Sequence, residues 1–220
     1  MDNLERSYCY YQRWRTLRFF FNMITFTNLN QDHPYLIFKK KYEEAIKEKQ
    51  KNIEAISISS YSKKFDEVNS RYVNLKFVDN KEFIFFSNYN SSKSLEFSDH
   101  KQITALIYWN SINTQIRLKA TIEKKSIKYN KSYFSTRSEK KNALAISSDQ
   151  SKPIDSFEIV IEKYNKSLQF DDLNECPDYW GGYAFKPYYF EFWEGHESRL
   201  NKRQVFYQEG DTWSSLILQP

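Results

Sequence analysis

The sequence predicts a mainly β protein in which a β-barrel has helices at its rim. Runs of β-branched and aromatic residues recur along 55–123, and clusters of Asn, Asp and Ser suited to turns separate them. Helical periodicity occurs before, between and after these runs. The chain of 220 residues fits one domain, because a domain of this size buries roughly 70% of the surface that its unfolded form exposes.

The elements follow in order along the chain. Residues 1–34 are expected to pack as an arm, because they lack a clear period and are too apolar for a disordered tail. Residues 35–220 are expected to form the single domain. It opens with an amphipathic helix, in which Tyr35, Phe38 and Tyr42 recur at helical steps after Pro34.

Strands are predicted next, as consecutive antiparallel neighbours, at 55–60, 71–78, 82–86, 103–109 and 115–123. Further helices are expected at 92–98, 127–134, 139–146 and 156–168. Closing strands are expected at 188–193, 202–208 and 213–218. This order predicts a barrel that its C-terminal strands close.

Composition argues against several classes of protein. The formal charge of +5 comes from lysines that alternate with glutamates, which indicates a solvated surface rather than a nucleic-acid site. The most apolar segment, 17–26, is interrupted by Arg18 and Asn22 and reaches about half the length of a membrane span. Cys9 and Cys176 form no CxxC pair, and the histidines show no metal-ligand spacing. We expect a cytoplasmic protein with no metal, in which His196 and both cysteines have a structural role or none.

All four glycines lie in the last 45 residues, within or close to three motifs. The motifs are PDYWGGY at 177–183, FEFWEG at 190–195 and RLNKR at 199–203. Because glycine serves where the backbone takes positive φ or approaches another group closely, this region is expected to shape a ligand site. Trp180, beside two glycines, is expected to pack between strands.

These motifs, in this order and followed by Trp213, Leu218 and Pro220, resemble the pyridoxamine 5'-phosphate oxidase family. The similarity extends from about residue 35 to the end. The resemblance implies an FMN-binding split β-barrel, antiparallel and Greek-key-like, with peripheral helices. It also implies a homodimer with FMN at its interface, which oxidises pyridoxamine or pyridoxine 5'-phosphate and passes the electrons to O2.

The resemblance implies two elements around the FMN phosphate. The family strand R-x-V-x-L-K matches Arg71, Tyr72, Val73, Asn74, Leu75 and Lys76, and the second element matches Phe86, Ser87, Ser91, Ser92 and Lys93. Ser92 replaces the usual arginine. The remaining flavin positions fall on Gln115, Gln150, Ser151, Trp193 and Arg203. A phosphate dianion that leaves water needs charged donors or hydroxyls, which Arg71, Lys93 and the serines provide. Taken singly, Arg71 and Lys93 are also consistent with ordinary surface charge.

The substrate phosphate, by the same resemblance, would meet Lys76, Tyr133, Arg137 and Lys141, where the family often has serine at the last position. Positions 133, 137 and 141 would share one face if the segment is one helix, and a solvated basic face is the alternative. Arg199 and Asn201 match the catalytic pair at the pyridine ring, with Asn201 in place of histidine. Asparagine cannot hold the positive charge that histidine can. The family's N-terminal arginine and tyrosine have no match among Arg6, Tyr8, Tyr10 and Arg13.

Three functions remain open from the sequence. The first is the oxidase itself, making pyridoxal 5'-phosphate and hydrogen peroxide from a phosphorylated pyridine. The second is a related FMN-dependent oxidase with another substrate, as in phenazine biosynthesis. The third is a protein that binds flavin or pyridoxal phosphate without turnover, because a fold alone does not determine function.

Overall fold

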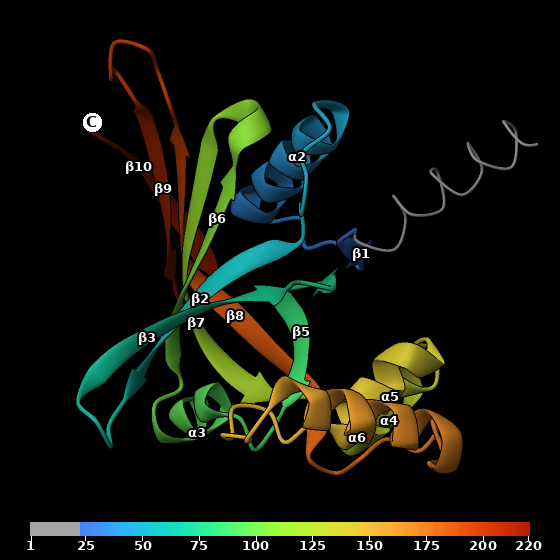
Figure 1. Cartoon of the computed structure of the whole chain (residues 1–220). Helices are drawn as coiled ribbons and strands as arrows, with labels where there is room; N and C mark the ends of the chain where they lie inside the picture. The colour runs from blue at the N-terminus through green and yellow to red at the C-terminus, as the bar shows by residue number, and fades with distance from the viewer. Residues whose placement is uncertain (1–22) are drawn as a thin grey trace, which may run out of the picture.

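The computed structural model describes residues 23–220, in which helices lie along one side and at one end of a sheet of ten strands (Figure 1). The strands are β1 (Thr25–Thr27), β2 (Ala55–Ser62), β3 (Glu67–Asn74), β4 (Phe77–Asp79), β5 (Glu82–Asn88), β6 (Gln102–Trp109), β7 (Thr114–Lys124), β8 (Trp180–Glu194), β9 (Lys202–Glu209) and β10 (Thr212–Leu218). The helices are α2 (His33–Lys47), α3 (Ser92–Asp99), α4 (Ile127–Phe134), α5 (Glu139–Ser147) and α6 (Phe157–Phe170), with a short 3-10 turn at Asn110–Ile112. Most of the expected arm, with Arg6, Tyr8, Cys9, Tyr10 and Arg13, lies outside the described residues.

The sheet has the strand order β1-β4-β5-β8-β7-β6-β2-β3, and the β9–β10 hairpin branches from β8. The pairing is antiparallel as predicted, except that β1 and β4 run parallel. The expectation that successive strands are neighbours is wrong, because β5 pairs with β8 and β6 pairs with β2. The expected closure by the C-terminal strands is wrong: in the described part of the chain β10 pairs only with β9, and β3 only with β2. The architecture is therefore a split barrel, mainly β, with helices at its periphery.

The central strand β8 is longer than the sequence predicts. It begins at Trp180 and includes Gly181, Gly182 and Pro187, residue types that often end a strand but do not do so here. A Cβ atom on Gly181 would lie 2.2 Å from side-chain atoms of both Asn130 and Tyr89. Near Pro187 the pairing with β7 shifts register between Lys119 and Ala120, a β-bulge that accommodates the proline.

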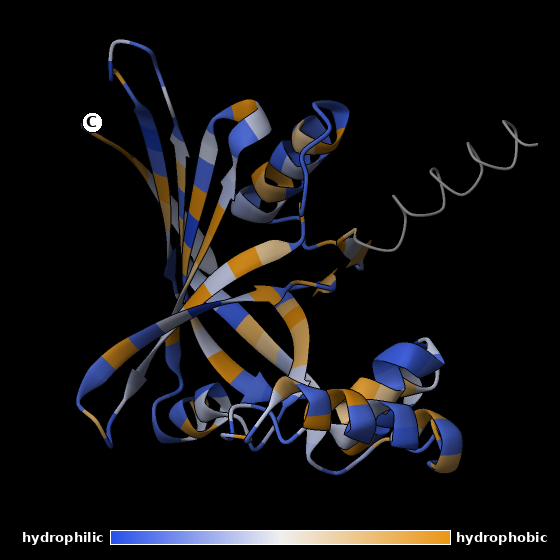
Figure 2. Ribbon diagram, in the orientation of Figure 1, coloured by the Kyte–Doolittle hydropathy of each residue, from blue (hydrophilic) through white to orange (hydrophobic). Residues whose placement is uncertain are grey.

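One main core fills the barrel, and alternation of apolar and polar residues along the strands is visible in Figure 2. Helix α2 lies against this core through Tyr35, Phe38 and Tyr42, as its periodicity predicts. Phe83 and Phe190 are among the fully buried aromatic residues, each worth about 1.5–3 kcal/mol of transfer free energy. A second, smaller core forms around Phe134, with Cys176 and Trp180.

Helices α4, α5 and α6 gather at one end of the sheet, beside the start of β8 (Figure 1). Ser126 caps α4 by accepting a hydrogen bond from the Tyr129 amide at 3.3 Å. The chain turns between Phe134 and Glu139, so the single helix considered for positions 133, 137 and 141 does not form. Within residues 23–220, no helix is both long and apolar enough to cross a membrane.

Candidate active site

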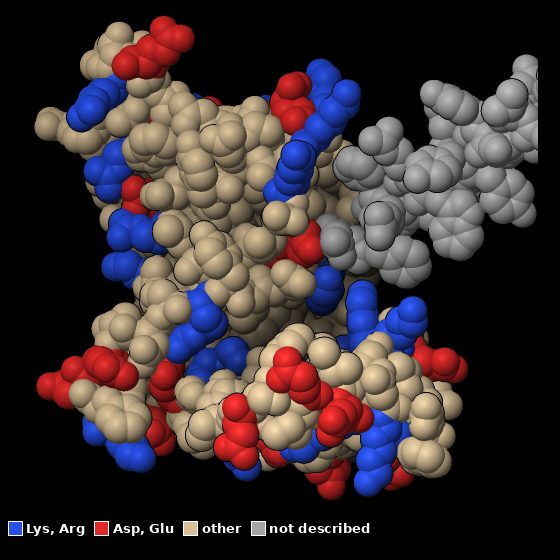
Figure 3. Space-filling view, viewed as in Figure 1, with Lys and Arg blue, Asp and Glu red and all other residues tan. Residues whose placement is uncertain are grey.

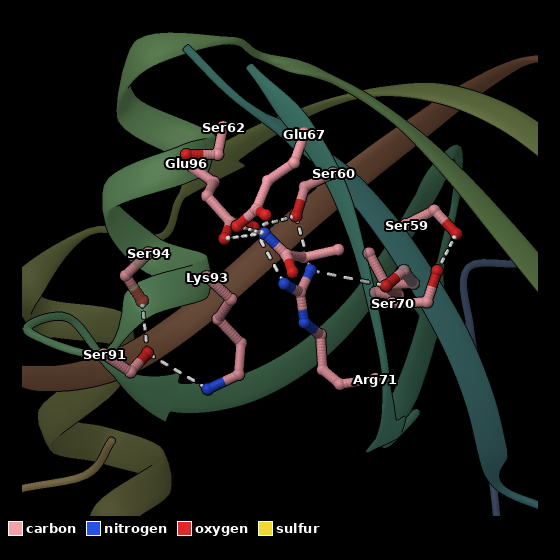
Figure 4. A network of polar contacts seen from close by, with 12 residues as sticks. Ser59, Ser60, Ser62, Glu67, Ser70, Arg71, Ser91, Lys93, Ser94 and Glu96 are labelled. Carbon is pink, nitrogen blue, oxygen red and sulfur yellow. Dashed lines mark hydrogen bonds and ion pairs between the residues drawn. The ribbon is translucent and has the colours of Figure 1, made fainter. Parts of the chain in front are cut away.

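A group of polar side chains lies where β5 meets the start of α3, and we call Arg71, Ser87, Ser91 and Lys93 the α3 cluster. Lys93 is 8% exposed, and its ammonium donates to the Ser87 hydroxyl at 3.0 Å. It also donates to the Ser91 hydroxyl at 3.0 Å, a contact that Figure 4 shows. No ion pair joins it to a carboxylate among residues 23–220. Burial and the charge of Arg71 lower the pKa of Lys93 to about 8, although Glu96 opposes this shift. A buried cation in this setting fits an anionic ligand.

Arg71 projects from β3 toward α3 (Figure 4). Its Nη2 forms an ion pair with Glu96 Oε2 at 2.8 Å, and its Nη1 donates to Ser60 Oγ and, at 3.4 Å, to the Ile58 carbonyl. The rest of the predicted phosphate strand is less involved. Tyr72 is 76% exposed, Asn74 is also exposed, Val73 is half-buried and Leu75 lies in the core. Ser92 is exposed on α3.

A cavity of about 230 Å³ adjoins the α3 cluster through Ser87, and we call it the α5 pocket. Its lining residues come from β5, the α4–α5 turn, α5, the segment after α5 and the start of β8: Phe86, Ser87, Asn88, Arg137, Lys141, Leu144, Ala145, Ser148, Gln150 and Trp180. The fold thus brings to one cavity residues predicted to contact FMN, Ser87 and Gln150, and residues predicted for the substrate phosphate, Arg137 and Lys141. A cleft is visible in Figure 3 between the helical end and the body of the molecule, with lysine and arginine at its edge.

Arg137 has the least satisfied side chain in the α5 pocket. Its Nη2 donates to the Lys141 carbonyl at 3.1 Å, but its buried Nη1 has no hydrogen-bond partner among the described residues. The guanidinium carbon lies 4.2 Å from the centre of the Trp180 ring. Burial lowers the pKa of Arg137. An arginine with a buried, unused donor fits an anion at this position.

Lys76 adds a third cation to this part of the molecule. Burial lowers the pKa of Lys76, and the charges of Lys141 and Arg137 lower it further, while Glu54 raises it. Within residues 23–220, no ion pair to a carboxylate is formed by Lys76, Arg137 or Lys141. Tyr133 stacks on Phe86 with ring centres 3.9 Å apart. The predicted substrate-phosphate residues are thus neighbours, although no single helix holds them.

Gln150 connects the pocket to the α3 cluster. Its Oε1 accepts hydrogen bonds from Ser87 Oγ and from the Asn88 amide, both at 3.3 Å. Ser151 follows with φ of 73° and is exposed. Lys93, Ser87 and Gln150 therefore form a continuous polar chain.

Other predicted flavin residues lie elsewhere. Gln115, Trp193 and Arg203 are paired across β7, β8 and β9, so they share one sheet face, and we call them the sheet row. Trp193 is twelve residues along β8 from Gly181, the partner of Ser87, which corresponds to about 40 Å. Within one chain the sheet row is therefore far from the α5 pocket. Arg203 is also held by the protein, with Nη2 2.8 Å from Glu191 Oε1.

The predicted catalytic pair lies in the loop between β8 and β9, next to the sheet row. Asn201 Oδ1 accepts a hydrogen bond from the His196 backbone amide at 3.0 Å, so the Asn201 side chain helps to shape the loop. Arg199 is exposed and has φ of 60°, an unusual backbone conformation for a residue with a side chain. His196 has a structural role, since its Nδ1 accepts from the Ser198 amide at 3.2 Å.

Sequence reasoning missed several residues. Glu96 forms an ion pair with Arg71, and the one feature of the sequence that could have indicated this role is its position one turn after Lys93 in the same helix. Glu191, which binds Arg203, lay unremarked inside the FEFWEG motif. Trp180 is buried as expected for packing, yet it also lines the α5 pocket. Gly181 permits close chain packing and Gly210 takes positive φ, 61°, in a hairpin turn, while the expectation that the glycine-containing region shapes a ligand site stays a prediction.

The split barrel has at one edge several cations without carboxylate partners among residues 23–220, an arrangement that suits an anionic ligand. Residues 180–220 match the family model described as the pyridoxine 5'-phosphate oxidase C-terminal dimerisation region. A pyridoxine/pyridoxamine 5'-phosphate oxidase of Hydrogenovibrio crunogenus is 32% identical over 194 residues, covering 86% of this chain and 89% of the relative. One of Colwellia psychrerythraea is 34% identical, covering 85% and 87%. The chain belongs to the pyridoxine/pyridoxamine 5'-phosphate oxidase family.

Solved structures confirm the fold. PhzG from Burkholderia lata 383, in complex with tetrahydrophenazine-1-carboxylic acid, superposes with a TM-score of 0.80 at 22% identity, covering 85% of this chain and 92% of that one. A pyridoxamine 5'-phosphate oxidase-related, FMN binding protein of Nostoc punctiforme gives 0.70 at 11% identity, covering 83% and 97%. At these identities the likeness is one of fold.

Proposed function

We propose that this protein is an FMN-dependent oxidase that converts pyridoxamine or pyridoxine 5'-phosphate into pyridoxal 5'-phosphate, with O2 as acceptor and hydrogen peroxide as product. The main support is the α5 pocket, where Arg137 has a buried donor without a partner and lies close to Lys76 and Lys141. A buried guanidinium donor without a partner, beside two further positive charges, is costly in the absence of an anion. The names of the curated relatives agree with this reaction.

The substrate phosphate would bind to Arg137, Lys141, Lys76 and the Tyr133 hydroxyl. Each charge-assisted hydrogen bond is worth about 1.5–3 kcal/mol, so several together hold the phosphate firmly. Tyr133 and Trp180 both stack against Phe86, which gives the pocket one rigid aromatic wall. Anchoring the phosphate there fixes the distance from the pocket to the reacting 4' carbon.

The α3 cluster fits the phosphate of FMN, because Lys93 is a buried ammonium that contacts only hydroxyls among the described residues. Lys93, Ser87, Ser91 and Arg71 would hold that phosphate, and Gln150 would contact the flavin beside them. FMN, when bound, supplies the redox chemistry, accepting hydride from the substrate and passing electrons to oxygen. With Ser92 in place of the family's arginine, Lys93 would have a larger share of the phosphate charge to balance.

A second copy of the chain would complete the site. Within one chain the sheet row lies twelve residues along β8 from the α5 pocket, and Arg199 and Asn201 follow it in the next loop, so these residues would reach the flavin of a partner. Two observations support a homodimer: the match of residues 180–220 to a dimerisation region, and the exposed apolar side chains of Leu216 and Ile217 on β10. In this arrangement Arg199 would contact the pyridine ring, and Asn201 would hold the loop that presents it.

One experiment tests cofactor and substrate together. We expect the purified protein to show a flavin absorbance spectrum, which pyridoxamine 5'-phosphate bleaches in the absence of oxygen. Hydrogen peroxide should appear on readmission of air. A colourless protein that takes up no added FMN would contradict the proposal.

The assignment of the substrate phosphate and the FMN phosphate to separate sites has its own test. Arg137→Ala should raise KM for pyridoxamine 5'-phosphate by about 10- to 100-fold, the loss of one or two charge-assisted hydrogen bonds, while FMN binding changes little. Lys40→Ala, on the exposed side of α2, is the control and should behave as wild type. Equal losses of substrate and FMN affinity in Arg137→Ala would refute separate phosphate sites.

A related oxidase with another substrate is the second candidate. Asn201 stands where the family has histidine, and a structural neighbour was solved with tetrahydrophenazine-1-carboxylic acid. A yellow protein that leaves both phosphorylated vitamins unchanged, yet is bleached by a reduced phenazine carboxylic acid, would favour this candidate. A flavin that no substrate bleaches would favour the binding protein without turnover.

A further inference from the structure

Glu96 lies at the centre of the polar contacts behind the α3 cluster (Figure 4). Its side chain is buried, and its carboxylate accepts hydrogen bonds from three other residues. Arg71 Nη2 donates to Oε2 at 2.8 Å, Asn69 Nδ2 donates to Oε1 at 3.1 Å, and Ser60 Oγ donates to Oε2. The carboxylate thus joins α3 to β2 and β3.

We propose that Glu96 is the positioning residue of the α3 cluster: it holds Arg71 beside Lys93, so that both cations face one phosphate. The inference rests on the proposed function, because it takes that phosphate to belong to FMN. Glu96 itself does not contact the ligand.

Arg71 keeps donors free for a ligand although Glu96 holds it, a contact that we call the clamp. A guanidinium has five N–H groups. Ser60 and the Ile58 carbonyl occupy Nη1, and Glu96 occupies one position on Nη2. The Nε–H and the second Nη2–H remain for a ligand. Arg71 is therefore fixed in orientation while two donors stay available.

Repulsion explains why a clamp is needed. Arg71 and Lys93 are close enough for the charge of Arg71 to lower the pKa of Lys93. The Arg71 side chain is partly exposed, so without a counter-charge it can turn toward water and away from Lys93. Glu96 removes this tendency, because its charge attracts Arg71 and also supports the protonated form of Lys93.

Glu96→Gln separates positioning from simple attraction. The substitution keeps the shape of the side chain and makes the cluster one charge more positive, so attraction alone would tighten FMN binding. Positioning gives the opposite sign, because Arg71 loses its clamp. We expect FMN to bind about tenfold more weakly, the loss of roughly one charge-assisted hydrogen bond.

The measurement is the Kd of FMN for flavin-free protein, followed by quenching of flavin fluorescence. Glu67→Gln is the matched control: Glu67 also accepts from Asn69 Nδ2, at 3.1 Å, but has no contact with Arg71 or Lys93 among the described hydrogen bonds. It should leave the Kd within about twofold of wild type, a change below 0.5 kcal/mol. A second variant serves if Glu96→Gln does not fold. Ser60→Ala removes a neutral acceptor of Arg71 and should raise the Kd of FMN by a few-fold.

The pH dependence adds a readout that a purely structural role would not change. The charged groups that act on Lys93 are Arg71 from β3 and Glu96 from its own helix. Without the Glu96 charge the pKa of Lys93 falls, so the decline of FMN affinity at alkaline pH should begin at lower pH in Glu96→Gln than in wild type. Glu67→Gln should keep the wild-type profile.

The outcomes are distinct. Weaker binding with an earlier alkaline decline, at unchanged Tm, supports the inference. Tighter binding in Glu96→Gln, or a Kd and pH profile equal to those of Glu67→Gln, overturns it and leaves the proposed function intact. Wild-type protein that binds no FMN overturns the proposed function and this inference together.

Discussion

At the scale of single residues, the buried ammonium of Lys93 has a consequence for stability. Its pKa of about 8 in the folded chain lies below the ordinary value of 10.5. Between these values the unfolded chain holds the proton that the folded chain has lost, so this group makes stability rise with pH. We expect the free energy of unfolding of ligand-free wild type, relative to Lys93→Met, to increase from pH 8 to pH 10.

Urea denaturation at several pH values measures this difference. The control is Lys101→Met, an exposed lysine for which wild type and variant should keep a constant difference. A flat difference for Lys93→Met would show that the ammonium is not destabilised in the folded chain.

The residues of the site were predicted to different degrees. Family motifs indicated Arg71, Lys93, Arg137 and Gln150, and the fold brings them to adjoining places. Glu96 escaped prediction because its role depends on a contact between α3 and β3, which no local pattern encodes. Whether the predicted residues bind the ligands assigned to them stays a prediction.

At the scale of elements, Gly181 shows how one position limits the sequence of a strand. An added Cβ would lie 2.2 Å from Asn130 Nδ2, while Asn130 Oδ1 accepts from the Gly182 amide at 2.9 Å. Gly181→Ala should therefore displace Asn130 and destabilise the protein by about 1–3 kcal/mol. Thermal or urea unfolding measures the loss.

A double-mutant cycle identifies the cause. In an Asn130→Ala background the clash is reduced, so Gly181→Ala should cost clearly less than in wild type. Equal costs in both backgrounds would place the strain elsewhere.

Periodicity predicted most elements close to their observed bounds, including α2, α4 and β10. Two errors have physical reasons. β8 begins eight residues before the expected start at 188, because glycines and a proline that usually end strands are accommodated by close packing and a bulge. The predicted strand 71–78 is two strands, because the chain leaves β3 after Asn74 and joins β5 as β4.

At the scale of the whole molecule, the distance between the α5 pocket and the sheet row makes a prediction about assembly. If sites are shared, Arg137→Ala and Arg203→Ala disable different halves of each site. In a twofold dimer that contains one chain of each variant, one site has both changes and the other has neither. Mixing the two variants under exchange conditions should restore about a quarter of wild-type activity, measured at a substrate concentration so low that neither variant alone turns over appreciably.

The control mixes Arg137→Ala with Lys141→Ala, which alter the same half and should not complement. Activity that stays at the level of the separate variants, in a mixture shown by mass spectrometry to contain mixed dimers, would contradict a shared site. Light scattering of the wild type gives the oligomeric state directly.

The bulge in β8 sets which way the second half of that strand faces. Side chains alternate between the two faces of a sheet, so an odd number of residues added or removed reverses all that follow. With the extra residue near Pro187, Trp193 faces the same side as Gln115 and Arg203. Deleting Tyr188 would turn this tryptophan into the barrel and bring Phe192 outward, although every residue of the C-terminal motifs would still be present. The parity of one strand is thus as necessary to this surface as the identity of its side chains.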